Sequence, residues 1–281
     1  MFSVLLLTAA FAACHKQESE TPELILSGDM EKAFPDPEFR KIVIDRADRD
    51  RDGKISLKEA QSLRELSACD SDIESVQGIE YFTNLTSFDC SYNRLTSLDL
   101  SKNQTLIYID CSHNKLSRLV LPESSNISTL DCSHNELSEL NVSRYILLHM
   151  LACSYNPITE LDISANKYIQ FVMCLNCRLT ALDTSNNPSM FALWCTNNRI
   201  GQLDLSKNKA LRQLMCGNNL IQSLDISKTD FGNKNETVVL SCSPMESLQT
   251  LYIKRGWSIH GITESRSSQL IPQHTQILYA D

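Results

Sequence analysis

Apolar and polar residues follow one repeated order between residues 85 and 229, with a fixed period of 21. One copy of the repeat reads Leu106-x-x-Ile109-x-Cys111-x-x-Asn114-x-Leu116-x-x-Leu119. The cysteine position is filled seven times in phase, by Cys90, Cys111, Cys132, Cys153, Cys174, Cys195 and Cys216. A period of this length predicts a solenoid, in which each repeat forms one coil that stacks on the next.

The residues just before each of these cysteines predict a short strand. Ile109 and Cys111 lie two positions apart, so in a strand both side chains point to the same face, which we assign to the interior. Stacked coils place such strands in parallel, about 4.8 Å apart, and the cysteines then form a ladder inside the solenoid. A second apolar pair, as in residues 98–101, 161–164 and 203–206, predicts a second strand on the opposite wall. The predicted fold class is an α/β solenoid dominated by short parallel β-strands in a right-handed coil.

An asparagine three residues after the cysteine predicts a turn of the chain toward the interior. It is present in six of the seven repeats, as Asn93, Asn114, Asn135, Asn156, Asn198 and Asn219. Its amide both donates and accepts hydrogen bonds, so it can satisfy backbone groups that the turn leaves unpaired. Cys177 replaces this asparagine in the remaining repeat, either as a tolerated substitution or as the partner of a nearby thiol.

The chain contains eleven cysteines, and we interpret the seven ladder cysteines as buried free thiols. They occupy a core position that leucine or isoleucine normally fills, where cysteine behaves as a small hydrophobic residue. Cysteines on parallel neighbouring strands would have to distort the stack to reach disulfide geometry. This interpretation excludes a disulfide framework or a metal site for the ladder.

The first residues predict export and a membrane anchor. Residues 1–13 are apolar and end in small residues, and this stretch is too short to span a membrane, so we predict a signal peptide. Phe11-Ala12-Ala13-Cys14 resembles a bacterial lipobox, in which the cysteine is lipidated, and we favour lipidation of Cys14 over ordinary cleavage. Residues 14–33 are then the lipidated cysteine and a flexible polar tether.

Residues 48–59 match every position of the 12-residue EF-hand calcium loop. The predicted ligands are the carboxylates of Asp48, Asp50 and Asp52, the carbonyl of Lys54, Ser56 through a water, and both oxygens of Glu59. The alternative is a solvated acidic turn. Helical spacing before and after the loop predicts two short flanking helices. Because sensors usually pair such loops and only one is present, we predict a structural Ca²⁺.

The chain divides into a cap, an array and a second cap. Residues 34–65 are the predicted helical, EF-hand-like N-terminal cap, which covers the open first coil. Residues 66–229 are the repeats. In the first coil we assign Ala68, rather than Cys69, to the ladder position, because Leu66 lies 22 residues before Phe88. Residues 230–281 are the last strands and a C-terminal cap, because the apolar end of a solenoid must be covered.

The outward residues beside the ladder change character along the chain. They are polar in the first coils, as in Tyr108, Asp110 and Ser112. From the fourth coil they include an apolar set, which we call the apolar patch: Met150, Phe171, Met173, Leu175, Trp194 and Met215. Contiguous exposed apolar surface marks interaction sites, so we predict that this patch binds a ligand. The alternatives are that the C-terminal segment covers it or that these coils shift register.

The 21-residue repeat with cysteine in the strand and Leu-Asp-Leu-Ser on the far wall resembles the leucine-rich repeat of the internalin family. The similarity is greatest to the cysteine-ladder type of internalin J, and the chain also resembles leucine-rich-repeat lipoproteins of Bacteroides-like bacteria. The match covers residues 35–281. It implies an extracellular binding protein or adhesin rather than an enzyme.

Composition narrows the function further. A net charge of −8 argues against general binding to nucleic acid or to an anionic membrane. We find no Ser/His/Asp or Cys/His set, phosphate loop or zinc spacing. His113 and His134 lie one repeat apart but lack a third ligand, so we interpret them as a surface pair. We predict a lipid-anchored monomer at the bacterial outer membrane or cell surface that binds an extracellular protein or glycan. The alternative is a self-assembling surface component, and an enzyme is the least favoured class.

Overall fold

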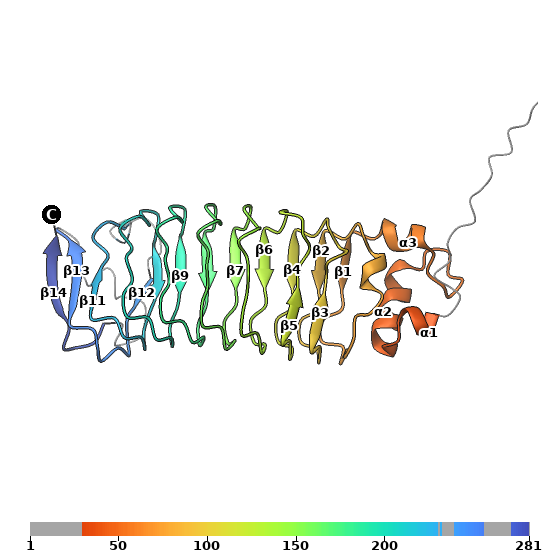
Figure 1. Ribbon diagram of the computed structural model, residues 1–281, viewed down its shortest axis with the longest axis horizontal. Helices are drawn as coiled ribbons and strands as arrows, with labels where there is room; N and C mark the ends of the chain where they lie inside the picture. The colour runs from red at the N-terminus through yellow and green to blue at the C-terminus, as the bar shows by residue number, and fades with distance from the viewer. Residues whose placement is uncertain (1–29, 230, 232–238, 256–270, 281) are drawn as a thin grey trace, which may run out of the picture.

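The computed structural model describes residues 30–229, 231, 239–255 and 271–280. They form an elongated solenoid of stacked coils with helices at one end and strands β13 and β14 at the other (Figure 1). The predicted fold class is confirmed. The predicted signal peptide, Cys14 and residues 14–29 lie outside the described residues, as do residues 230, 232–238, 256–270 and 281 of the predicted C-terminal region. In the part of the chain that is described, no helix is long and apolar enough to cross a membrane.

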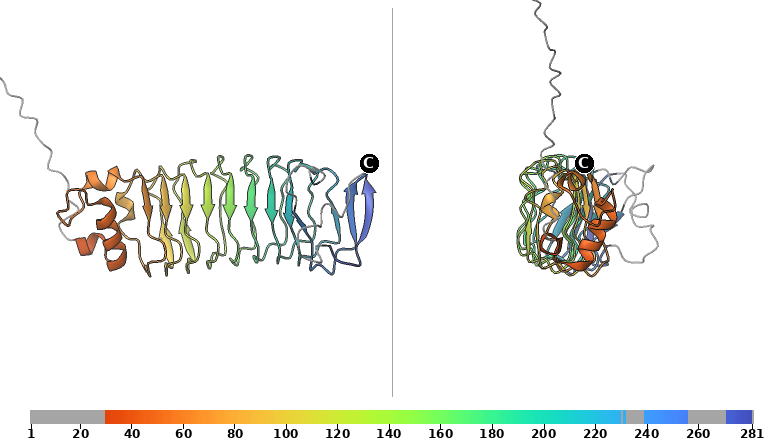
Figure 2. Two further views of the ribbon diagram at one scale, coloured as in Figure 1. Left: turned by 180° about the vertical axis from the view of Figure 1, so that it is seen from behind. Right: turned by 90° about the vertical axis from the view of Figure 1, so that its right-hand side faces the viewer.

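One wall of the solenoid is a parallel sheet of nine strands, which we call the strand wall (Figures 1 and 2). In spatial order they are β1 (Glu65–Ser67), β2 (Ser87–Asp89), β4 (Tyr108–Asp110), β6 (Thr129–Asp131), β7 (Met150–Ala152), β8 (Phe171–Met173), β9 (Ala192–Trp194), β10 (Gln213–Met215) and β12 (Val239–Ser241). The middle residue of each strand is buried, and corresponding residues pair across the sheet, as Ile109 does with Phe88 and Leu130. This regular register fixes which side chains face outward.

The cysteine ladder lies inside the strand wall as predicted, and its thiols are free and fully buried. Burial raises the pKa of the Cys195 thiol to about 12. Ala68 occupies the first ladder position and Cys69 is exposed, which confirms the predicted register of the first coil. The ladder also extends to Cys242, whose Sγ lies 3.6 Å from that of Cys216.

The turn asparagines connect neighbouring coils. Asn114 Nδ2 donates to the carbonyl of Cys90 at 2.9 Å, and its Oδ1 accepts from the N–H of Leu95 at 3.0 Å. These bonds satisfy the backbone of the preceding coil. In the exceptional repeat, Cys177 is buried and its thiol donates to the carbonyl of Cys153 at 3.4 Å. Cys177 is therefore a free-thiol substitution in this structure.

The opposite wall differs from the prediction. Strands form there at β3 (Ser97–Asp99) with β5 (Arg118–Val120), and at β11 (Ser223–Asp225) with β13 (Thr250–Lys254) and β14 (Gln276–Ala280). No strand forms at 161–164 or 203–206, where the sequence predicted one. There a second row of buried asparagines joins the coils. Asn187 Nδ2, for example, donates to the carbonyls of Ile163 and Asn166 at 2.9 and 3.0 Å.

The N-terminal cap consists of α1 (Met30–Ala33), α2 (Pro37–Ala47) and α3 (Leu57–Ser62), next to the short 3₁₀ turn η1 (Ile79–Tyr81). Asp36 caps α2 by accepting from the N–H groups of Glu38 and Phe39. Its other oxygen accepts from Glu74 and Ser75 of the first coil. This one carboxylate therefore ties the cap to the solenoid.

Two predicted boundaries change. The predicted tether of residues 14–33 ends too late, because α1 is helical and Met30 and Ala33 pack against the core. The predicted boundary between the cap and the repeats falls at 65/66, whereas β1 begins at Glu65. Four residues such as Met30–Ala33 are too few to show helical periodicity, and their order comes from contact with the core.

Candidate functional site

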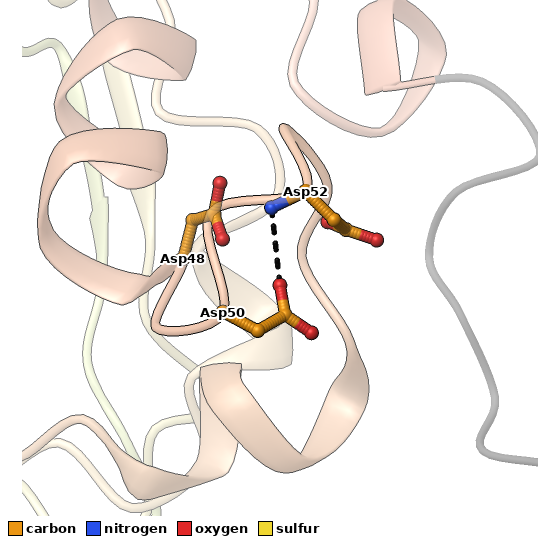
Figure 3. A group of neighbouring side chains, drawn as sticks. All are labelled: Asp48, Asp50 and Asp52. Atoms are coloured by element: carbon orange, nitrogen blue, oxygen red, sulfur yellow. Dashed lines mark hydrogen bonds between the residues drawn. The ribbon is translucent and has the colours of Figure 1, made fainter.

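The predicted calcium loop lies between α2 and α3 (Figure 3). Asp48, Asp50 and Asp52 each bring one carboxylate oxygen to within 4.8 Å of the others. Asp48 is half-buried at the end of α2, while Asp50 and Asp52 are exposed. Closely spaced carboxylate oxygens are the ligands that Ca²⁺ prefers.

Backbone N–H groups of the loop donate hydrogen bonds to the Asp48 carboxylate. Its Oδ2 accepts from the N–H of Gly53 at 2.9 Å, and its Oδ1 accepts from the N–H of Arg51. Arg51 and Gly53 both have positive φ, of 64° and 79°, and this conformation costs glycine least. The N–H of Lys54 bonds to Asp52 at 2.8 Å. The loop backbone therefore holds the three carboxylates at short range.

Ser56 and Glu59 also lie at this loop, where their side chains hydrogen-bond to each other. They form a capping box at the start of α3, in which Glu59 Oε2 accepts from the N–H and the hydroxyl of Ser56, both at 2.9 Å. Glu59 Oε1 accepts from the N–H of Arg49 at 2.7 Å. Burial acts to raise the pKa of Glu59, but these hydrogen bonds outweigh it and lower the pKa.

Electrostatics in the loop fit a cation. The Asp52 N–H acts to lower the pKa of Asp50, but desolvation and the charges of Asp52, Glu59 and Asp48 together raise it. Crowded carboxylates resist ionising together, and a bound divalent ion reverses this effect. The residues present thus fit Ca²⁺, with Asp48, Asp50 and Asp52 as the side chains already brought together.

The strand wall carries two kinds of outward side chain in the same backbone position. At the last residue of each strand, β2, β4 and β6 present Asp89, Asp110 and Asp131. From β7 to β10 the same position holds Ala152, Met173, Trp194 and Met215, and β12 ends in Ser241. Neighbours in this row are paired in register, as Met173 is with Trp194 and Trp194 with Met215. The wall therefore has an acidic half and an apolar half.

The apolar patch lies at the predicted positions, and most of its side chains are only partly exposed. Phe171 is 37% exposed, and the other five members are half-buried. Ala152 of β7 and Ala192 of β9, which pair in register with Met173 and Phe171, are buried. The Trp194 Nε1 atom is buried and has no hydrogen-bond partner among the described residues.

Phe191 extends the apolar patch and was not predicted from the sequence. Its ring lies 5.6 Å from that of Phe171, and the Arg212 guanidinium lies 5.8 Å above it. Phe191 precedes β9 by one residue, outside the three positions assigned to the outward face. Phe191 lies four residues before a ladder cysteine. The same position one coil after another could have indicated an outward row, because it also contains the exposed Ile107.

In the acidic half the carboxylates are held by local hydrogen bonds. Asp110 Oδ1 accepts from the N–H of Ser112 at 2.9 Å, and Asp131 accepts likewise from Ser133. Burial raises the pKa of Asp110, the Ser112 bonds oppose the rise, and the charges of Asp131 and Asp89 add to it. Burial and the neighbouring like charges therefore disfavour the ionised form of Asp110.

A row of stacked rings borders the acidic half. The rings of Tyr92, His113, His134 and Tyr155 are 4.1 Å apart at each step. All four residues have φ near 55°, so the repeated left-handed turn aligns the rings. The row continues as hydrogen-bonded amides from Asn176 to Asn197 and Asn218. Among the described residues, the only group of three possible metal ligands is in the calcium loop, so the histidines remain a surface pair.

Comparison with known proteins supports the internalin-like interpretation. The chain is 37% identical over 70 residues to Internalin J of Listeria monocytogenes serotype 4b, which covers 25% of this chain and 8% of that protein. The solved functional domain of that species' InlJ, which includes a cysteine ladder, matches with a TM-score of 0.55 and 27% identity. That match covers 80% of this chain and 56% of the other. No protein-family profile matches the chain.

More distant structures share the fold. Internalin C2 of L. monocytogenes has a TM-score of 0.56 at 19% identity, covering 68% of this chain and 88% of the other. A leucine-rich-repeat protein of Leptospira interrogans gives 0.56 at 19% identity, with coverage of 70% and 56%. The chain thus has a leucine-rich-repeat fold similar to that of internalins, and it spans only part of the length of its internalin J relative.

Proposed function

We propose that this chain is a cell-surface binding protein, anchored by a lipid on Cys14, that recognises an extracellular partner through the apolar patch. The observation that carries the proposal is the patch itself. Met150, Phe171, Met173, Trp194 and Met215 lie on adjacent strands from β7 to β10, and Leu175 follows β8 by two residues. Tryptophan, phenylalanine and methionine are enriched in protein interfaces. The internalin-like fold supports a protein-binding surface protein in general.

The rigidity of the wall supports this role. A continuous backbone ladder joins the strands, and turn asparagines, or Cys177 in the coil of β8, hold each coil to the one before it, so the patch is presented in one geometry. A preorganised surface loses little conformational freedom on binding. Of the two expected partner classes, the large aromatic and methionine surface favours a protein over a glycan.

Calcium has a structural role in this proposal. Asp48, Asp50 and Asp52, with the Lys54 carbonyl, Ser56 and Glu59, would hold one Ca²⁺ in the loop between α2 and α3. The ion would neutralise crowded carboxylates and fix the angle between the two helices. Since α2 is tied to the first coil through Asp36, the ion would stabilise the end of the solenoid.

Anchoring at Cys14 rests on the lipobox-like sequence and is tested separately. Cells that express the full chain would be labelled with an alkyne-bearing fatty acid. We expect labelled protein in the membrane fraction, and no label after Cys14→Ala. Equal labelling of the variant would contradict lipidation at this residue.

The binding role is tested with arrays of extracellular proteins and of glycans, probed with the full chain. Trp194→Ala is the test variant and Asp183→Ala on the opposite wall is the matched control. We expect a protein ligand whose binding falls at least about tenfold with Trp194→Ala and is unchanged with the control. A ligand with the same affinity for the parent and for both variants would place the site elsewhere.

A self-assembling surface component is the second candidate, because the same patch could meet another copy of the chain. Sedimentation of the full chain separates the two functions. We expect a monomer. A concentration-dependent oligomer that disappears with Trp194→Ala would favour self-assembly instead.

A further inference from the structure

The acidic half of the strand wall has no evident role in the fold. Asp89, Asp110 and Asp131 each accept a hydrogen bond from the N–H of the serine two residues later, at 2.9 to 3.0 Å. If the turn required this bond, it would recur in every coil. In the apolar half Ala152, Met173 and Trp194 occupy the same position without a carboxylate, yet the strands stay in register.

These carboxylates lack a cationic partner within the described part of the chain. The ion pairs there join Arg94 to Asp72 and Glu74, Arg40 to Glu31, and Arg46 to Asp45. None reaches the three wall carboxylates. Like charges on directly neighbouring strands destabilise a sheet, so a positively charged partner surface would relieve an existing repulsion.

The acidic and apolar halves are continuous. From β2 to β10 the wall advances six strand spacings, about 29 Å at 4.8 Å each, and only Ala152 separates Asp131 from Met173 in the row. This length is that of an ordinary protein interface. One partner can therefore contact both halves at once.

We propose that the partner is a protein whose contact surface places lysine or arginine beside an apolar cluster, the basic part lying on β2, β4 and β6 and the apolar part on β8, β9 and β10. This inference rests on the proposed function and specifies its partner. Charged pairs set specificity and association rate, while buried aromatic anchors supply most of the affinity. Tyr108, 40% exposed beside Asp110, adds a ring face for an arginine or lysine.

The test uses a matched pair of triple variants of the full chain. Asp89, Asp110 and Asp131 are changed to Asn, which keeps an oxygen for the serine N–H and removes the charge. The control changes Asp162, Asp183 and Asp204 to Asn on the opposite wall, where each also accepts from the serine two residues later. Both variants lose the same charge, and unfolding curves verify that both fold.

The probe is a displayed library of random peptides of about 15 residues, which are long enough when extended to cross the wall. Selection on the parent chain should enrich peptides that combine lysine or arginine with aromatic or aliphatic residues. Their affinity should fall at least about tenfold with the strand-wall triple variant and less than about twofold with the control. It should also fall between about 50 mM and 500 mM salt.

The outcomes separate this inference from the proposed function. Enriched peptides that depend on Trp194 but carry no excess of basic residues, or that lose equal affinity with both triple variants, would overturn the inference and leave the apolar site standing. Peptides unaffected by Trp194→Ala would overturn the proposed site itself. A chain that enriches no peptide and binds a glycan would overturn the protein partner.

Discussion

Strands β2, β4 and β6 and strands β8, β9 and β10 are built on the same frame. Both groups bury a central apolar residue, place a free thiol next to it and belong to one parallel sheet. Their outward residues are nonetheless opposite in chemistry, with Asp89, Asp110 and Asp131 in one group and Met173, Trp194 and Met215 in the other. Since the fold accepts either set, the difference between them points to recognition rather than to stability.

The largest expected effect tests whether the two interiors are equivalent. Leu130→Ala in the acidic half and Leu193→Ala in the apolar half each empty a fully buried position. Such truncations cost about 2 to 5 kcal/mol of unfolding free energy, and we expect similar losses for both in urea unfolding. A loss confined to one variant would show that the halves differ in their cores as well as on their surfaces.

Calcium should act on one end of the wall only. A ligand that binds the folded state alone adds about 2.7 kcal/mol at a hundredfold excess over its dissociation constant. Chelator should therefore lower the melting temperature and speed amide exchange at β1 and β2, next to the cap, more than at β9. The double variant Asp48→Ala with Glu59→Ala should be insensitive to chelator. A parent chain whose melting curve ignores chelator would refute the calcium site.

The smallest expected effect is that of single aspartates on the pH dependence of stability, and it has opposite signs on the two walls. Burial and neighbouring carboxylates raise the pKa of Asp110, so its ionised form opposes folding, and stability falls as pH rises from the unfolded pKa through the folded one. The Ser185 bonds lower the pKa of Asp183, which therefore stabilises the fold above its unfolded pKa, and this contribution is lost as pH falls through the folded one.

At pH 7, Asp110→Asn should accordingly raise the unfolding free energy slightly, and Asp183→Asn should lower it slightly. Urea titrations at pH 7 and pH 3 measure both effects, and the differences from the parent should shrink at the lower pH. Destabilisation by both variants at pH 7 would mean that the acidic row stabilises the fold. The difference between the acidic and apolar halves would then no longer point to recognition.

The sequence predicted what the 21-residue period controls. The ladder, the turn asparagines, the outward rows and the first-coil register follow from spacing, because a strand has period 2 and the coils stack in phase. Features that depend on contacts between coils were missed. Cys242 follows Cys216 by 26 residues, so the period did not reveal it, and the stacking of Tyr92 on His113 follows from a left-handed turn that no spacing shows.

The two candidate sites show the same difference between features that are local in sequence and features that depend on contacts between coils. The calcium loop is local in sequence, and its three aspartates were predicted and found together. The apolar patch was predicted by position, but its half-burial and the contribution of Phe191 depend on side chains packing across strands. Such packing is set by the size of neighbours one coil away, which a single repeat does not encode.

Trp194→Ala tests the central claim most directly, with partner affinity and unfolding free energy measured on the same preparation. The partner is the protein identified on the array, and Leu193→Ala is the core reference. We predict at least about a tenfold loss of affinity, with a loss of stability well below that of Leu193→Ala, because Trp194 is half-buried whereas Leu193 is fully buried. A variant destabilised as much as Leu193→Ala, with no separate loss of binding, would show that Trp194 is a core residue and that the apolar patch is not a binding site.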